Sequence, residues 1–216
     1  RLRIPANIGV CVGKNVDPRL IRRGVEILIE DRCGVPTSLG VDNTVAGFAA
    51  NGFPLELARD RVYAGCHWLA IPGREYALMD IVKVNLAAIF EVALREMLAD
   101  LAAEPSVAVL WERFRKHLRS AMDTVAKGFD FQYEHFHKVF PELVLDLLCQ
   151  GTLEKGLDAS NGGVEYYTFG VDGAALATAA DSFAALEQRL EKQPRLTWEE
   201  LRTHLESNWA GPEGER

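Results

Sequence analysis

Three things that the sequence lacks set the first limits on its function. No apolar stretch of about 20 residues occurs in the 216-residue chain, so no membrane span is expected. The N-terminus lacks the long apolar region of a secretion signal, and it lacks an initiator Met, which suggests a chain cut from a longer one. Basic residues are outnumbered, with 24 Lys and Arg against 31 Asp and Glu and a net charge of −7. Because phosphate binding needs an excess of clustered Lys and Arg, a general nucleic-acid binder is excluded.

Cysteine and histidine are scarce, and neither is spaced for metal binding. The four cysteines stand far apart, at Cys11, Cys33, Cys66 and Cys149. They form neither a zinc knuckle nor a Cys-x-x-Cys pair, so we expect free thiols in a reducing compartment and a cytoplasmic protein. His135 and His137 are two residues apart and cannot share one face of a helix. We interpret them as part of a solvated helix end and predict no metal site.

The residues that are present predict a helix-rich α/β fold. Apolar residues make up 48% and charged residues 25% of the chain, as in ordinary globular proteins. Short apolar segments predict buried strands at residues 8–12, 62–64 and 164–167. Helical segments lie between them, and this alternation is typical of α/β architectures. Because a complete barrel would need more strands, the pattern fits a piece of a larger barrel better than a closed domain.

Three segments carry helix signals of their own. Asp17, followed by proline, predicts a capped helix start. From Leu78 onward apolar residues recur at steps of three and four, which predicts a helix along this segment. Thr197 and Glu200 form a capping-box pattern at the start of a later helix. In contrast, segment 33–38 contains Gly and Pro and is expected to be a loop.

Gly65-Cys66, at the end of the predicted strand 62–64, is the first candidate for chemistry. Reactive groups in α/β folds sit at the carboxyl ends of strands, where the loops converge. Gly65 lets the backbone turn tightly and leaves Cys66 at the tip. From these residues alone, an inert core cysteine and a reactive one both stay open.

The motifs on both sides of Cys66 shift the balance toward a reactive cysteine. Before and including it stand Gly34-Val35-Pro36-Thr37, Asp42-Asn43, Gly52, Leu57-Ala58-Arg59-Asp60 and Gly65-Cys66. After it stand Leu153-Glu154-Lys155-Gly156-Leu157-Asp158, Gly162-Gly163-Val164-Glu165-Tyr166, Ala180-Asp181-Ser182-Phe183-Ala184-Ala185 and Asn208-Trp209-Ala210-Gly211. In this order and at these spacings, over nearly the whole chain, they resemble the glycyl radical enzymes of the pyruvate formate-lyase-like family.

This resemblance implies both a fold and an activity. The fold would be a segment, residues 1–216, of the ten-stranded α/β barrel of glycyl radical enzymes. In the family mechanism a glycyl radical takes the hydrogen atom of a cysteine thiol, and the thiyl radical then takes one from the substrate. The implied function is that of an anaerobic glycyl radical enzyme, either a lyase, decarboxylase or dehydratase, or a catalyst of radical C–C addition. The family's radical-bearing glycine lies in a C-terminal Arg-Val-x-Gly-Tyr-type loop that this sequence does not contain, so the chain is expected to be inactive alone.

The sequence departs from the family pattern next to the cysteine. Many family lyases and dehydratases carry Glu two residues after it, where this chain has Trp68, and this departure speaks slightly against the diol-dehydratase type. Pyruvate formate-lyase has two adjacent cysteines, whereas His67 follows Cys66 here, which speaks against an acetyltransferase reaction with coenzyme A. The resemblance therefore implies Cys66 and His67 as catalytic residues. Trp68 is interpreted as a pocket wall, and Asn43 and Thr37 are expected to contribute to substrate binding through their motif positions.

The same resemblance implies partners and a cofactor. No cofactor is expected within this segment; the glycyl radical would come from the missing C-terminal domain, where a radical SAM activating enzyme installs it. A small-molecule substrate and a homodimer of the full-length protein are expected as well. The alternative reading is a helix-rich α/β binding or assembly module in which Cys66 is inert.

Overall fold

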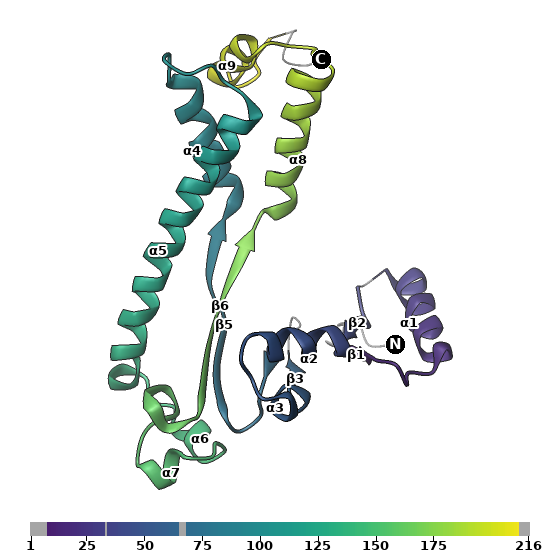
Figure 1. Ribbon diagram of the computed structural model, residues 1–216, viewed down its shortest axis with the longest axis vertical. Helices are drawn as coiled ribbons and strands as arrows, with labels where there is room; N and C mark the ends of the chain where they lie inside the picture. The colour runs from purple at the N-terminus through teal and green to yellow at the C-terminus, as the bar shows by residue number, and fades with distance from the viewer. Residues whose placement is uncertain (1–7, 33, 65–67, 212–216) are drawn as a thin grey trace. The chain divides into compact units, whose positions relative to one another are not determined.

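The computed structural model describes residues 8–32, 34–64 and 68–211 (Figure 1). The chain forms two compact units. Unit 1 comprises residues 1–79 and 136–168, and unit 2 comprises residues 80–135 and 169–216. The prediction that the whole chain is a single barrel segment stays a prediction.

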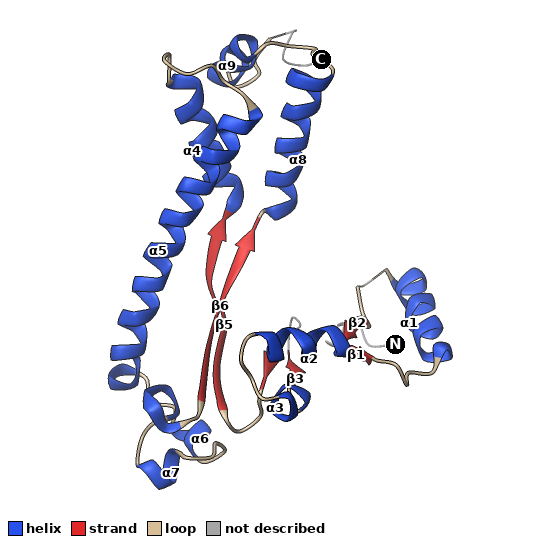
Figure 2. Ribbon diagram, viewed as in Figure 1, coloured by secondary structure: helices blue, strands red, loops and turns tan. Residues whose placement is uncertain are grey.

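Unit 1 begins with two parallel strands joined by a helix. β1 (Gly9–Val12) pairs in parallel with β2 (Thr37–Gly40), and Gly9 lies opposite Thr37. α1 (Pro18–Asp31) connects the two strands, as Figure 2 shows. Parallel neighbours require a crossover of this kind, so the segment is one β-α-β unit.

The predicted start of α1 is confirmed. The predicted loop before β2 extends too far, because its last two residues belong to the strand. The Asp17 carboxylate accepts a hydrogen bond from the Arg19 amide at 2.8 Å, as an N-cap residue does. Segment 33–38 was expected to be a loop throughout, but β2 already begins at Thr37. The Thr37 amide donates to the carbonyl oxygen of Ile8 at 3.0 Å, and this pairing with β1 extends the chain where turn residues had suggested a bend.

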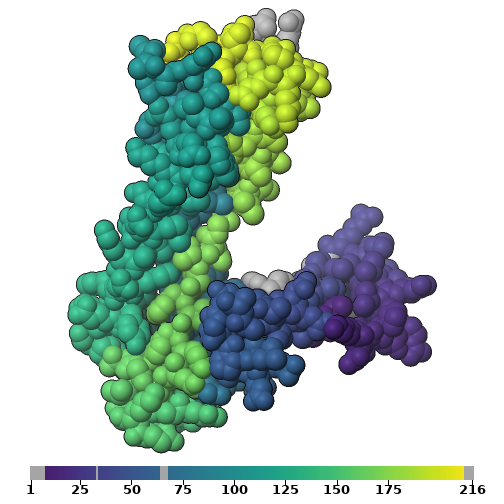
Figure 3. Space-filling model, viewed as in Figure 1, coloured from purple at the N-terminus to yellow at the C-terminus, as the bar shows by residue number. Residues whose placement is uncertain are grey.

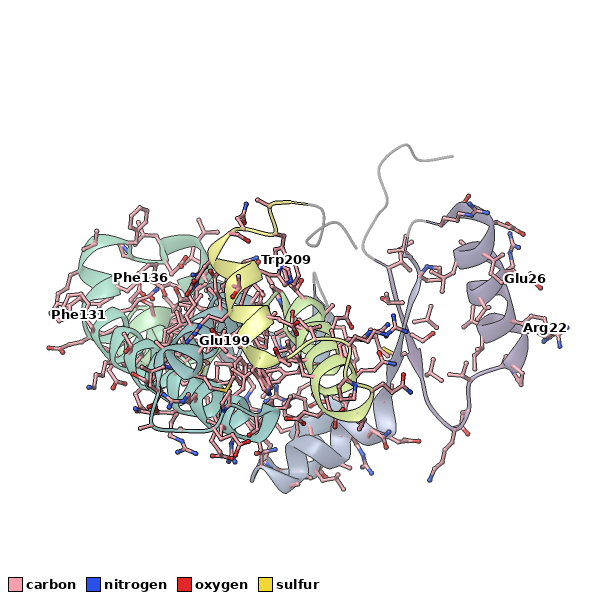
Figure 4. All side chains as sticks on the ribbon, turned by 90° about the horizontal axis from the view of Figure 1, so that it is seen from above. Arg22, Glu26, Phe131, Phe136, Glu199 and Trp209 are labelled. Atoms are coloured by element: carbon pink, nitrogen blue, oxygen red, sulfur yellow. The ribbon has the colours of Figure 1, made fainter. Side chains whose placement is uncertain are left out.

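α1 lies against the rest of unit 1 with little burial. None of its residues is buried, and Leu20, Val25 and Ile29 are exposed on it. Figure 4 shows Arg22 and Glu26 projecting from the side of α1 that faces away from β1 and β2. The helix is therefore held in unit 1 by its connections and not by a core of its own.

The next four elements of unit 1 precede or directly follow residues 65–67 in the sequence. α2 (Val41–Ala50) packs against α3 (Leu55–Arg59). β3 (Val62–Ala64) and β4 (Trp68–Ala70) form an antiparallel hairpin. The predicted strand at residues 62–64 is confirmed, whereas β4 is not predicted.

The predicted helix from Leu78 onward is wrong over its first part. Residues Glu75–Asn85 form β5, which pairs with β6 (Tyr166–Ala174). The helical spacing is present, but Tyr76 and the β-branched side chains at 81, 82 and 84 favour an extended backbone once a partner strand is available. α4 begins only at Leu86, where the Asn85 side chain accepts a hydrogen bond from the Ala88 amide at 3.0 Å.

The core of unit 2 is built from three helices. α4 (Leu86–Ala99), α5 (Val107–Val139) and α8 (Leu176–Leu186) carry apolar stripes, and α4 packs against α8. In Figure 3 the yellow atoms of the C-terminal part of unit 2 lie directly against its teal helices. The buried side chains of this cluster are Phe90, Ala93, Leu94, Met97, Leu110 and Phe114. Phe183, from the Ala-Asp-Ser motif, lies edge-on to Phe90 with the ring centroids 4.9 Å apart. That motif therefore serves helix packing.

Unit 2 ends in the predicted capped helix. α8 continues into a π-helical stretch, η2 (Glu187–Lys192), and α9 (Trp198–Glu206) follows. The Thr197 hydroxyl accepts from the Glu200 amide at 3.2 Å, and the Glu200 carboxylate accepts from the Thr197 amide at 2.6 Å, so the capping box is confirmed. After α9, Trp209 stacks on His204 with the ring centroids 5.2 Å apart.

Two family motifs of unit 1 form one network of turns. α6 (Leu143–Asp146), α7 (Thr152–Lys155) and the π-helical turn η1 (Ala159–Gly163) follow one another. The Lys155 ammonium donates to the carbonyl oxygens of residues 162, 163 and 164 at 3.1–3.3 Å. A Cβ on Gly163 would collide with the carbonyl oxygen of Leu157 and would lie 2.7 Å from that of Asp158. The two motifs are therefore explained by close backbone packing.

Candidate active site

The β3–β4 hairpin determines where the candidate cysteine lies along the fold. Ala64 pairs with Trp68, so residues 65–67 form the whole connection between the two strands. Cys66 is the middle residue of that connection and His67 follows it. Both lie outside the described residues, so their predicted catalytic roles stay predictions. What the structure describes is the part of unit 1 that carries the connection.

Both ends of the hairpin meet at the Glu75 carboxylate. Arg61, the residue before β3, places its Nη1 3.8 Å from Oε2 of Glu75. The amide of Ile71, the residue after β4, donates to the same oxygen at 2.7 Å. The other carboxylate oxygen accepts a hydrogen bond from the Thr168 hydroxyl on β6. Since 0% of the Glu75 side chain is exposed, one buried group joins the two strand ends to each other and to β6.

The Arg61 guanidinium lies in the corner formed by two nearly perpendicular aromatic rings. Its central carbon is 3.5 Å from the centroid of Phe48 and 4.4 Å from that of Phe53. Phe53 in turn lies 5.5 Å, centroid to centroid, from Tyr166. Burial lowers the pKa of Arg61, and the nearby Glu75 charge opposes that shift. A guanidinium nevertheless stays protonated at physiological pH, so a positive charge is held inside unit 1.

α2 is attached to the hairpin by a hydroxyl pair. The Thr44 hydroxyl donates to the carbonyl oxygen of Gly40 at 2.7 Å and lies 2.9 Å from the Tyr63 hydroxyl of β3, from which it accepts. This contact brings the start of α2 next to the strand that leads to Cys66. The Asp42-Asn43 motif, which directly precedes Thr44, thus lies on an element that contacts β3.

The three described residues of the predicted site lie on different elements. Thr37 is at the start of β2, where its hydroxyl donates to the carbonyl oxygen of Ile8 at 3.3 Å. Asn43 is exposed in the first turn of α2, beside Thr44. Trp68 is half-buried at the start of β4. Their predicted contributions to substrate binding stay predictions.

Sequence reasoning missed Arg61 and Glu75, the two charged residues that support the hairpin. In the sequence, Arg61 follows Arg59 and Asp60, and this run indicates an exposed polar helix end. Glu75 similarly follows Arg74, which is half-buried and forms an ion pair with Glu165. No local pattern distinguishes a charge that turns inward from one that turns outward. The burial of these two charges depends on contacts with other segments of the chain, namely Phe48, Phe53 and the second strand end, and the local sequence does not reveal such contacts.

A second group of ionisable side chains lies in unit 2. Asp80 has a left-handed backbone with φ of 58°, and its Oδ1 is 2.7 Å from the Lys83 ammonium. A hydrogen bond from the Lys83 ammonium and one shared with Asp172 lower the pKa of Asp80, whereas the hydrogen bond with Asp80 raises the pKa of Asp172. A non-glycine residue at this φ is costly, so the surrounding structure enforces it.

The predicted histidine pair lies near the end of α5. The His135 ring stacks on Phe131, and its Nδ1 lies 2.9 Å from the Phe131 carbonyl oxygen. His135 and His137 are half-buried, so the predicted solvated helix end is only partly right. Within residues 8–32, 34–64 and 68–211, no three His, Cys, Asp or Glu side chains are grouped so that they could hold a metal ion.

The thiols that the structure describes are both free. Cys11 is exposed on β1, and Cys149 is buried beside α6. Burial raises the pKa of the Cys149 thiol, and the nearby Asp146 charge adds to that shift. A protonated, enclosed thiol is a poor nucleophile, so Cys149 is inert core material. In the part of the chain that the structure describes, no helix is long and apolar enough to span a membrane.

The chain as a whole is similar to known proteins. The sequence profile of the family described as Pyruvate formate lyase-like matches residues 3–214. The chain is 24% identical over 188 residues to (2S)-3-sulfopropanediol dehydratase of Klebsiella oxytoca, covering 79% of this chain and 22% of that protein. It is 23% identical over 223 residues to trans-4-hydroxy-L-proline dehydratase of Clostridioides difficile, covering 97% and 28%.

Solved structures show the same fold. The structure described as 1,2-propanediol dehydration in Roseburia inulinivorans matches with a TM-score of 0.81 at 20% identity, over 95% of this chain and 27% of that one. The chain thus spans about a quarter of the length of the relatives that it matches. The predicted partial α/β barrel is confirmed by this likeness. With its profile match over almost every residue, the chain belongs to the pyruvate formate lyase-like family of glycyl radical enzymes.

Proposed function

We propose that this chain is the cysteine-loop segment of a longer glycyl radical enzyme of the lyase type, and that Cys66 carries its thiyl radical. The observation that carries the proposal is the hairpin register. Ala64 and Trp68 are paired, and Cys66 is the middle of the three residues that join them. The buried Glu75 contacts support both ends of that hairpin. Hydrogen-atom transfer needs reacting atoms about 3–3.5 Å apart, and a supported loop tip meets this demand.

The proposed chemistry uses one hydrogen atom, which the cysteine passes on and recovers. A glycyl radical on another part of the enzyme accepts the thiol hydrogen and becomes glycine. The thiyl radical then takes a hydrogen atom from a substrate carbon and becomes a thiol again. In a dehydration, the substrate radical loses a hydroxyl group and a proton as water. The product radical takes the hydrogen atom back from the thiol, and the thiyl radical that remains takes one from glycine, so the glycyl radical is restored and hydrogen atoms and electrons balance over the cycle.

Dehydration is the reaction class that we favour. Both named relatives are dehydratases, and their names identify substrates with a hydroxyl group. This chain differs from many family members in having Trp68 where they have a carboxylate. The half-buried indole is proposed to wall the pocket, Thr37 and Asn43 to contribute to substrate binding, and His67 to move the proton that leaves with the hydroxyl group. A radical SAM activating enzyme is the proposed partner.

The test uses the full-length protein that contains this chain, activated anaerobically by a radical SAM enzyme. Sulfopropanediol, trans-4-hydroxyproline and propane-1,2-diol are offered as substrates, and the dehydrated products are measured. In Cys66→Ala we expect an unchanged organic radical signal by electron paramagnetic resonance and no turnover. The glycyl radical does not require the thiol for its formation, whereas hydrogen abstraction from the substrate does.

Cys11→Ala is the matched control for this experiment. Cys11 is an exposed thiol on β1, and its removal is expected to leave both the radical signal and the turnover unchanged. Turnover that survives in Cys66→Ala would contradict the proposal and favour an inert cysteine. Turnover of none of the three substrates by an enzyme that carries a full radical signal would contradict the dehydratase assignment alone.

A further inference from the structure

Arg61 is an unusual residue to find inside unit 1. Only 2% of its side-chain surface is exposed, and its charge faces a single carboxylate, that of Glu75, at 3.8 Å. Nε and Nη2 are both buried and have no hydrogen-bond partner among the described residues. Buried charges are costly unless they are fully paired and hydrogen-bonded. A buried ion pair with incomplete pairing is weak evidence for a role in stability.

The position of Arg61 suggests what the charge does instead. It is the last residue before β3, and Ile71 is the first residue after β4, so the two flank the base of the hairpin. Both contact Oε2 of Glu75, and they are therefore fixed relative to each other. The hairpin has three residue pairs between this base and the 65–67 connection. A rotation at the base is carried to the tip over that short distance.

The planar shape of the Arg61 guanidinium determines how this side chain is oriented against its neighbours. The guanidinium lies over the Phe48 ring and against Phe53, and because the two rings are nearly perpendicular, at 85°, it occupies the corner that they form and is restrained on two sides. Phe48 belongs to α2 and Phe53 to the segment before α3, so the stack relates these elements to the hairpin. Lysine would keep the charge but would lose the planar stack. Methionine would fill the space between the rings but would lose the contact with Glu75.

We propose that Arg61 is a positioning residue: through Glu75 and the two phenylalanine rings it sets the direction of the β3–β4 hairpin and thereby the placement of its tip. The inference rests on the proposed function, because the tip matters to catalysis only if Cys66 reacts there. Arg61 itself touches no reacting atom. Its effect reaches the chemistry through the hairpin.

The first experiment follows turnover in the activated full-length enzyme. The double variant Arg61→Met/Glu75→Gln removes the buried charges together, keeps the space between the rings filled and leaves a side-chain amide oxygen that can accept from the Ile71 amide. We expect it to fold, to show the wild-type radical signal, and to lose kcat by about 10- to 100-fold with KM changed less than about threefold. The kinetic isotope effect with substrate deuterated at the abstracted position should rise, since a misplaced thiol slows that step. A purely structural role would move none of these in a folded variant.

The second experiment measures the reactivity of Cys66 at the hairpin tip and does not depend on catalysis. In the 216-residue chain, the alkylation rate of Cys66 by iodoacetamide is measured by peptide mass spectrometry, with exposed Cys11 as the internal reference. We expect Arg61→Met/Glu75→Gln and Arg61→Lys to change the Cys66 rate by about fivefold or more relative to Cys11, because reactivity follows the placement of the thiol. Arg22→Met, at an exposed arginine of α1, is the matched control and should change neither rate.

The two experiments separate the possible failures. Unchanged Cys66 alkylation and unchanged kinetics in the double variant would overturn the positioning role of Arg61. A changed alkylation rate together with full turnover in Cys66→Ala would leave the positioning role intact and overturn the proposed function. A double variant that fails to fold would show that Arg61 is needed for stability, which is the opposite of what we infer.

Discussion

The core of unit 2 and the hairpin base of unit 1 are held together in different ways. Between α4, α5 and α8 the buried groups are almost entirely apolar, with Met97 and Leu110 at 1% and 0% exposure. At the hairpin base two of the buried side chains are charged, Arg61 and Glu75. Apolar packing is non-directional and tolerates small shifts, whereas an ion pair and a ring stack fix distances and angles. The apolar core of unit 2 therefore contributes mainly to stability, whereas the contacts at the hairpin base mainly fix the position of the β3–β4 hairpin.

The largest effect is expected from a cavity in unit 2. Leu110→Ala removes a fully buried side chain and should lower the free energy of unfolding by about 4 kcal/mol. Hydrogen exchange followed by mass spectrometry should show faster exchange in α4 and α5 and unchanged exchange at residues 61–75. Leu101→Ala, at a side chain that is 88% exposed, is the control and should have almost no effect. Faster exchange at the hairpin in Leu110→Ala would show that the two regions are not independent.

A broken ion pair in unit 1 should have the next largest effect. Glu75→Gln leaves the Arg61 charge buried without a counter-charge, which should lower the free energy of unfolding by about 3 kcal/mol. Exchange should rise in β3, β4 and the start of β5 and stay unchanged in α4. Glu56→Gln, an exposed glutamate on α3, is the matched control. A silent Glu75→Gln would mean that the hairpin base needs no charge.

The turn network of unit 1 should give a pH-dependent effect. Burial alone would raise the pKa of Asp158, but hydrogen bonds from the Ser160 hydroxyl and amide and from the Glu142 amide outweigh it and hold the pKa below its usual value. The contribution of Asp158 is therefore fully present above the ordinary carboxyl pKa of about 3.9 and is lost as the pH falls through the depressed value. Asp158→Asn should cost about 2 kcal/mol at neutral pH and little at strongly acidic pH.

Chemical denaturation at a series of pH values measures this difference. The exposed Asp123→Asn on α5 serves as the control and should follow the wild type at every pH. A loss in Asp158→Asn that is the same at acidic and neutral pH would show that packing, and not the carboxylate charge, stabilises the turns.

The smallest effect is expected at the end of unit 2. Thr197→Ala removes the hydroxyl that caps α9 and should cost about 1 kcal/mol, seen as faster exchange in the first turn of that helix. Thr197→Ser keeps a capping hydroxyl and should restore most of the protection. If serine and alanine behave alike, the Glu200 carboxylate alone maintains the helix start.

The predictions from sequence succeeded where one segment carries its own signal. Asp17 and Thr197 cap the helices that follow them, because capping depends on residues within one turn. The strand at 62–64 was recognised as a short apolar run before glycine. The order of motifs around Cys66 identified the family, since each motif keeps a local turn or packing contact.

The predictions failed where the outcome depends on a distant segment. The strand β5 carries a helical spacing of apolar residues, and only the pairing with β6 makes it extended. Thr37 begins a strand because β1 lies beside it, despite the turn residues that precede it. Arg61 and Glu75 look like surface charges in the sequence and are buried by residues on α2 and β6. Long-range contacts of this kind leave no pattern in a single sequence.

The glycine at position 163 has a consequence for how related chains are compared. The carbonyl oxygens of Leu157 and Asp158 leave no volume for even one methyl group there, whatever the substrate. Every homologue that keeps this turn must therefore retain glycine at this site, and its invariance would be a marker of ancestry that carries no information on specificity. Attempts to sort the family by reaction should give such positions no weight.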